Sequence, residues 1–253
     1  MAGQIYEVLD SAADGVRLQI EFQPRVNASL IASGIPFVRA IVVHNESGFE
    51  MGAVIVTATL DAATWTHTID GPLAVNSATR IDGVDGFANV VNKASEATPA
   101  TLVVKATPGP RIHAAIEVSA HNEWLNFPGM HAALAAFVQP NSRAVTRVLR
   151  VASDLLIERT NSGSLDGYQS GPERANQIAG GIYEALRGLE VTYINPPASF
   201  EMTGQKVRTT EQVVAERFGT CVDLSVLPAR SSRVTRVRAR ILACAADRLD
   251  RVV

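Results

Sequence analysis

The chain has 253 residues, of which 47% are hydrophobic, and a formal net charge of −2. This length and composition suffice for one large domain or two modest ones with proper cores, and they exclude a disordered chain. The near-neutral charge argues against a general nucleic-acid-binding surface. No apolar run is long enough to cross a bilayer.

The start of the chain, MAGQIYEVLDSAADG, lacks the basic and apolar regions of an export signal. The two cysteines, Cys221 and Cys244, give no disulfide framework. We therefore expect a cytoplasmic protein that does not contact a membrane.

The first half of the chain has the alternating pattern of half-buried β-strands. Apolar and polar residues alternate, or β-branched residues form short runs, over 16–22, 36–44, 54–60, 101–107 and 112–118. Turn-forming sequences lie between them: HNESG (44–48), DGVDG (82–86) and TPGP (107–110). This spacing favours an antiparallel β-sandwich over residues 1–122. No charged cluster, metal-ligand spacing or glycine loop interrupts the pattern, so we expect this half to be structural, without a metal or cofactor.

From about residue 122 the apolar pattern becomes helical. In 142–159 the apolar residues form one stripe, and Ser142 is placed to cap the helix start. In 172–188 Pro172 stands at the entry and Gly188 at the exit. The predicted stripes are Val145, Val148, Leu149, Ala152, Leu155 and Leu156, then Ile178, Ala179, Ile182, Tyr183 and Leu186. A short strand is expected at 191–194. The sequence therefore predicts an α+β protein: the sandwich, then a mostly helical part.

Residues 203–227, TGQKVRTTEQVVAERFGTCVDLSVL, carry the candidate chemistry. Thr209 and Gln212 have the spacing of a capping box, which predicts a short helix ending near Arg217, with Gly219 as a left-handed residue just past its end. Thr220 can cap a second helix whose first turn holds Cys221. Backbone N–H groups and the helix dipole at that position lower a thiol's pKa and can hold an oxyanion. The apolar residues expected to root this helix in the core are Val222, Leu224, Val226 and Leu227.

The order of a capped helix, Gly-Thr-Cys, Asp and Leu resembles the nucleophile segment of transglutaminase-like, papain-type cysteine domains. Five stretches more narrowly resemble an uncharacterised domain at the N-terminus of very large bacterial helicase-related proteins. They are NEW (122–124), AFVQPNS (136–142), GYQ (167–169), NPPASFE (195–201) and GQKVRTTEQVVAERFGTCVDL (204–224). The similarity extends over about residues 15–227. It implies a β-sandwich over 1–122, the N-terminal part of a transglutaminase-like domain over 123–227, and an atypical tail over 228–253.

The resemblance implies an acyl-transfer site, in which a Cys nucleophile is followed by a His base and an Asp or Asn that orients it. Only Cys221 can be assigned, at the nucleophile position. In the family the His and its partner follow the cysteine helix, whereas Asp223 lies on another helix face from Cys221. All five histidines precede Cys221: His44, His67, His113, His121 and His131. No base or orienting partner is therefore assigned.

Several of these residues could have a structural role in place of a functional one. His121 and His131 flank the predicted boundary and could approach Cys221, but a histidine bound to nearby backbone is the common case. Cys221 could be a buried structural thiol, and Cys244 is expected to be an apolar filler. The loops 166–169 and 195–201 could line a groove, or only hold the cysteine helix.

The tail 228–253 contains seven of the chain's 20 arginines. Pro228 is expected to break or kink the helix that begins at Thr220. The proline, the arginine density and the abrupt loss of resemblance suggest a change of reading frame near residue 227, in a gene that once encoded more. The tail could contact phosphate or an acidic partner, although its irregular spacing favours a solvated end.

Three functions follow from these observations. The first is a non-catalytic accessory or truncated N-terminal portion of a helicase-related protein, although no GxxxxGK[ST] loop is present. The second is a cysteine-dependent acyl-transfer enzyme, a protease or amidase, whose His comes from missing sequence or a partner chain. The third is a protein-binding module that uses the sandwich. We expect the first, with an unidentified protein partner or the rest of a larger polypeptide, and without direct nucleic-acid binding or enzyme activity by the chain alone.

Overall fold

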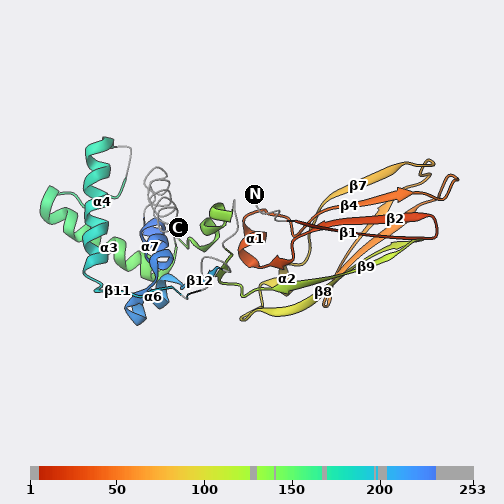
Figure 1. Cartoon of the computed structure of the whole chain (residues 1–253). Coiled ribbons are helices and arrows are strands. Elements are labelled where there is room, and N and C mark those ends of the chain that lie inside the picture. The colour runs from red at the N-terminus through yellow and green to blue at the C-terminus, as the bar shows by residue number, and fades with distance from the viewer. Residues whose placement is uncertain are drawn as a thin grey trace. The chain divides into compact units, whose positions relative to one another are not determined.

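The computed structural model describes residues 6–125, 130–139, 141–166, 170–196, 198 and 204–231. Their contacts divide the chain into two compact units, which meet in sequence between Glu123 and Trp124 (Figure 1). The first unit is built from strands with two short helices, and the second from helices with short strands. The α+β class predicted from the sequence is confirmed.

Two β-sheets form the first unit. One has the strand order β1–β2–β4–β7 and is antiparallel throughout: β1 (Glu7–Ala13), β2 (Val16–Phe22), β4 (Val38–Asn45) and β7 (Ala78–Val84). The other has the order β3–β9–β8–β5–β6: β3 (Arg25–Val26), β9 (Arg111–Val118), β8 (Thr98–Thr107), β5 (Val54–Leu60) and β6 (Ala63–Ile69). Its pairs are antiparallel except for β3 with β9, which is parallel. The helices α1 (Ala28–Ala32) and α2 (Ala88–Val91) lie at one end of the sheets (Figure 1).

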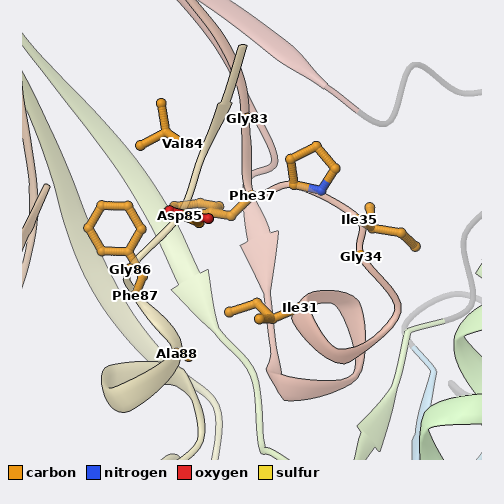
Figure 2. A pocket seen from close by; sticks show the side chains of 11 residues that line it. Ile31, Gly34, Ile35, Phe37, Gly83, Val84, Asp85, Gly86, Phe87 and Ala88 are labelled. Atoms are coloured by element: carbon orange, nitrogen blue, oxygen red, sulfur yellow. The ribbon is translucent and has the colours of Figure 1, made fainter. Parts of the chain in front are cut away.

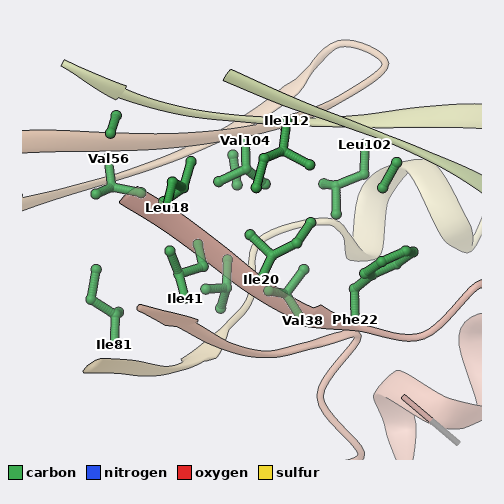
Figure 3. Packing of buried hydrophobic residues seen from close by; sticks show 14 of the residues in the cluster. Leu18, Ile20, Phe22, Val38, Ile41, Val56, Ile81, Leu102, Val104 and Ile112 are labelled. Carbon is green, nitrogen blue, oxygen red and sulfur yellow. The ribbon is translucent and has the colours of Figure 1, made fainter. Parts of the chain in front are cut away.

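One apolar core lies between the two sheets. Alternation along β2 directs Leu18, Ile20 and Phe22 inward, and each is almost fully buried. They meet side chains of the second sheet such as Leu102 and Val104 (Figure 3). The cluster extends without interruption over 27 buried hydrophobic residues drawn from both sheets. Two sheets joined by such a core form a β-sandwich.

The sequence pattern missed the strands β1, β6 and β7. Every residue of β1 is exposed or half-buried, so no apolar alternation marks it. In β7, Asp82 and Gly83 were assigned to a turn, but the strand continues to Val84. Strand β7 keeps its place because it pairs with β4, and Asp82 accepts a hydrogen bond from Arg80 Nε at 2.7 Å on the exposed face.

The second unit contains five helices among the residues described. They are the 3₁₀ helix η1 (Met130–Phe137), α3 (Arg143–Thr160), α4 (Gly171–Arg187), α6 (Thr210–Glu216) and α7 (Cys221–Ser231). Two small sheets accompany them: β10 (Glu123–Trp124) pairs with β12 (Gln205–Lys206), and β11 (Thr192–Tyr193) runs parallel to β13 (Phe218–Gly219). No helix in the described part of the chain is long and apolar enough to span a membrane.

Helices α3 and α4 pack against each other through the apolar stripes that the sequence predicts. Ser142 Oγ accepts a hydrogen bond from Val145 N at 3.2 Å, so the predicted N-cap of α3 is confirmed. The shared cluster consists of Val148, Ala152, Leu156, Ile178, Ile182 and Ala185. Tyr183 was wrongly placed in this stripe, because it is 64% exposed. One residue past the buried Ile182 turns a helix by about 100°, which carries Tyr183 off the packed face.

Three of the stretches that carry the resemblance lie partly or wholly outside the described residues. These are GYQ (167–169), residue 140 within AFVQPNS and, within NPPASFE, residues 197 and 199–201. In helix α4, Arg174 is buried and holds the segment that follows α3, since its guanidinium donates to the carbonyl oxygens of Ser162 and Ser164 at 2.7 Å each.

Candidate functional site

The helix before the candidate cysteine begins as predicted but ends differently. Thr209 and Gln212 form the reciprocal capping box of α6, with Thr209 N donating to Gln212 Oε1 at 2.8 Å. The left-handed residue at its end is Arg217, with φ of 55°, and not Gly219 as predicted. Gly219 lies in β13, where an added Cβ would be 3.1 Å from Asp223 Cβ. A small residue is therefore needed at position 219 for close packing against α7.

Helix α7 begins at Cys221, as predicted, and Thr220 caps it together with Asp223. Asp223 N donates to Thr220 Oγ1 at 3.4 Å, while Asp223 Oδ2 accepts from Thr220 N at 2.9 Å. This reciprocal pair satisfies backbone donors that a helix start leaves free. Because the Asp223 side chain turns back toward Thr220, it serves the helix start and not the thiol.

The Asp223 carboxylate is fully buried and has further partners. It accepts hydrogen bonds from Arg208 N at 2.7 Å and from Arg208 Nη1 at 3.1 Å. The Arg208 guanidinium also lies 4.7 Å above the centre of the Phe218 ring. From the other side, Gln205 Nε2 donates to Thr220 Oγ1 at 2.9 Å. We call Gln205, Arg208, Thr220 and Asp223 the polar network; it joins β12, the segment before α6, and the start of α7.

Sequence analysis did not identify Gln205 and Arg208 as part of this site. Both precede Cys221 by more than ten residues, and neither has a local motif that would mark it. The sequence marks this region only through the glycine at position 204. In the structure Gly204 has a φ of 93°. A Cβ at position 204 would lie 1.9 Å from the carbonyl oxygen of Trp124, so only glycine lets β12 pass so close to Trp124.

Cys221 is half-buried beside an apolar cluster that contains Trp124, Leu134, Phe137 and Val207. Burial raises the pKa of its thiol, and the negative charge of Asp223 adds to this, while the backbone N–H groups of Val222 and Cys221 lower the pKa. The net shift is upward. The expected lowering of this pKa was therefore wrong: the N–H groups act as predicted, but the desolvation of the sulfur outweighs them.

The histidines with described side chains all lie in the first unit. His44, His67 and His113 belong to β4, β6 and β9. His121 has its Nδ1 2.9 Å from the carbonyl oxygen of Ala94, so it is bound to backbone. His131 lies in η1, and its side chain is outside the part that the structure describes. The described side chains of the second unit therefore include no histidine beside Cys221.

Helix α7 continues past the point at which the sequence predicted its end. Val222 and Val226 are buried in the same apolar cluster as Trp124, as predicted, while Leu224 is only half-buried. Pro228 does not end the helix, which extends to Ser231. A proline removes one N–H donor, and the neighbouring turns can hold a helix together across that gap. Cys244 and the rest of the tail from 232 lie outside the described residues.

A second candidate site lies in the first unit. A pocket of about 680 Å³ opens where β7 ends, between Gly83–Ala88 and the loop from α1 to β4 (Figure 2). Phe37 and Phe87 line it and pack edge to face, with ring centroids 5.8 Å apart. Sequence analysis treated this half as structural. The pocket is formed by segments that lie about 50 residues apart, so no single stretch of sequence reveals it.

No group of three or more His, Cys, Asp and Glu side chains that could hold a metal ion occurs in the described part of the chain. No family model, curated protein or solved structure matches the chain.

Proposed function

We propose that this chain is a non-catalytic accessory module in which the segment around Cys221 has a structural role. The observation that carries the proposal is the state of the cysteine. Its thiol is half-buried, its pKa is raised, and the carboxylate that interacts with it, that of Asp223, is occupied by Thr220 and Arg208. A thiol nucleophile needs the opposite environment, one that favours the thiolate and brings a base within hydrogen-bond reach.

The further proposal is that the second unit is the first portion of a transglutaminase-like fold of the helicase-related kind. Its support is the local order of elements: capped α6, the strand β13, and then α7 beginning at Cys221. The resemblance itself rests on the capped helix followed by Gly-Thr-Cys, Asp and Leu. Accessory domains of large proteins can retain such a segment for packing while its chemistry is unused.

Thiol alkylation tests the non-catalytic role. In the Cys244→Ala variant Cys221 is the only cysteine, and iodoacetamide modification at neutral pH is followed by mass spectrometry in the native state and in denaturant. We expect the native rate to be at least about tenfold below the unfolded rate, because a half-buried thiol with a raised pKa is less accessible and forms less thiolate. The Cys221→Ala variant reports Cys244 alone and serves as the control.

The opposite result has a definite meaning. If native Cys221 reacts faster than the unfolded chain at neutral pH, its thiol is activated and the non-catalytic role is wrong. A cysteine-dependent acyl-transfer enzyme would then be the better proposal, and a partner that supplies a histidine would be sought.

A second function is favoured by the pocket in the first unit: binding of a protein partner by the sandwich. The pocket lies beside β7, which is the outermost strand of its sheet among the residues described. Its volume is within the range of about 300–1,000 Å³ that is usual for ligand sites. This function is compatible with an inert Cys221, because the site lies wholly in the first unit.

A further inference from the structure

The pocket at the end of β7 has an apolar interior. Phe37 and Phe87 are almost fully buried, and Val84, the last residue of β7, is buried with them. Ile31 and Ile35 line the side formed by α1 and the following loop (Figure 2). Such walls match an aliphatic or aromatic side chain, whose apolar surface would be removed from water in the pocket.

Among the strands that the structure describes, none pairs with the outer edge of β7, and this edge leads into the pocket. The ladder of β7 runs from Ala78 to Val84 and goes to β4 alone, and no described strand pairs with its other side. In an antiparallel strand with one neighbour, alternate N–H and C=O groups point away from that neighbour. These groups form a template for another extended chain. A helix or a compact ligand could not satisfy them.

Glycines leave room for a second backbone at this point. Gly83, within β7, and Gly86 and Gly34 all line the pocket, and a Cβ built on any of them would meet nothing within 4 Å. All three have a left-handed φ, of 64°, 99° and 70°, which itself favours glycine. Here the open space adjoins both the strand edge and the apolar pocket.

Asp85 gives the pocket a negative charge. Among the described residues that line the pocket it alone is charged, and it is exposed. A carboxylate at this position attracts a basic side chain and repels an acidic one. The preferred ligand therefore combines an apolar anchor with a neighbouring positive charge.

We propose that β7 and the pocket at its end bind an extended peptide segment of a partner protein. The segment adds a strand to the free edge of β7, inserts one apolar side chain into the pocket, and places a Lys or Arg beside Asp85. Strand addition of this kind takes its affinity from main-chain hydrogen bonds and its specificity from pockets for alternate side chains. The proposal rests on the binding function proposed above for the sandwich, and it specifies the ligand.

A labelled peptide tests this site directly. The probe is a fluorescein-labelled peptide of alternating threonine and valine that ends in Phe-Lys, and binding to the full chain is followed by fluorescence anisotropy. We expect saturable binding that weakens about tenfold when the probe's Lys is replaced by Glu, and similarly when its Phe is replaced by Gly. N-methylation of alternate peptide nitrogens should abolish binding, because it removes the donors that pair with the edge.

Two protein variants locate the binding. Ile35→Trp fills the pocket and Asp85→Lys reverses its charge. Each substitution should lower the affinity for the probe by at least about tenfold. Asp10→Lys is the matched control, since Asp10 is an exposed carboxylate on β1 at the opposite edge of the same sheet, and it should leave binding unchanged. Far-ultraviolet circular dichroism and a thermal melt show whether each variant is folded. The altered probes test the same contacts without changing the protein.

Several results would overturn the proposal. Absence of saturable binding would do so, and so would binding that Ile35→Trp and Asp85→Lys leave unchanged. If the free chain is a dimer by sedimentation that Ile35→Trp makes monomeric, the occupant is a second copy and not a partner peptide. The result of the binding experiment does not depend on that of the alkylation experiment. Cys221→Ser should bind the probe like the native chain whatever the reactivity of the thiol.

Discussion

The two units of the molecule are held together by different means. The first has one continuous cluster of 27 buried hydrophobic residues between two sheets. Among the residues described, the second has two separate clusters of six buried hydrophobic residues each, and the polar network around Asp223 links its short elements. A buried side chain therefore matters in the first unit for the volume it fills, whereas in the second the buried Asp223 matters for the hydrogen bonds it accepts.

The largest effect is expected from a cavity in the sandwich. Phe22 is 1% exposed in the centre of the core, so Phe22→Ala should lower the free energy of unfolding by about 4 kcal/mol. Each unit contains one of the two tryptophans, Trp65 in the first and Trp124 in the second. In a Trp124→Phe background, Trp65 fluorescence during denaturant unfolding reports the first unit alone.

The control for this variant is Val8→Ala, on β1, because Val8 is 45% exposed. It should change the free energy of unfolding by less than about 0.5 kcal/mol. If Phe22→Ala were as mild as Val8→Ala, the sandwich core would not be the main source of stability in the first unit.

The second effect is expected from the polar network. Asp223→Ala leaves Thr220 N and Arg208 N without their acceptor and the Arg208 guanidinium without its buried partner. Removal of one member of a buried, hydrogen-bonded charge pair costs about 3 kcal/mol. In a Trp65→Phe background, Trp124 fluorescence should show that loss during denaturant unfolding.

Glu216→Ala separates burial from charge. Glu216 also contacts the Arg208 guanidinium, with Arg208 Nε 3.5 Å from Glu216 Oε2, but its side chain is 42% exposed. Its removal should cost less than about 1 kcal/mol. Equal losses for Asp223→Ala and Glu216→Ala would mean that Asp223 contributes only a surface charge, and the contrast drawn between the two units would fail.

Local signals in the sequence predicted the starts of the helices. Ser142, Thr209 with Gln212, and Thr220 each cap a helix as expected, because a cap needs only residues that are adjacent in the chain. The strands marked by apolar alternation were found for the same reason. Strand β1 was missed because its residues are almost all exposed, and its existence depends on pairing with β2.

The features that the sequence did not reveal depend on residues that are distant in the chain. The position of Cys221 at a helix start was predicted, but its pKa depends on burial beside Trp124 and Val207, which other elements bring to it. Gly219 has a role only because Asp223 packs against it. The pocket likewise needs the loop after α1 and the end of β7 together.

A smaller effect tests how closely α7 is packed. Gly219→Ala adds a Cβ at 3.1 Å from Asp223 Cβ and 3.4 Å from Leu224 Cδ2, so it should destabilise the second unit by about 1 kcal/mol. Gly180→Ala is the matched change in α4, where an added Cβ meets nothing within 4 Å. There alanine should stabilise the helix by about 0.5–1 kcal/mol. Thermal melts of the two variants should shift in opposite directions, and a shift in the same direction would contradict the close contact at Gly219.

The smallest effect concerns alkaline pH. Burial raises the pKa of the Cys221 thiol in the folded chain above its ordinary value, which is about 8.5 in an unfolded chain. Between these two values the unfolded chain releases the proton and the folded chain keeps it, so the contribution to stability is fully present below the ordinary pKa and is lost as the pH rises through the raised one. Unfolding of Cys244→Ala should therefore become easier from about pH 8 upward, beyond the loss seen in Cys221→Ala/Cys244→Ala. Equal losses in both proteins would show that the thiol titrates alike folded and unfolded, and the second unit would then expose Cys221 more than its apolar cluster implies.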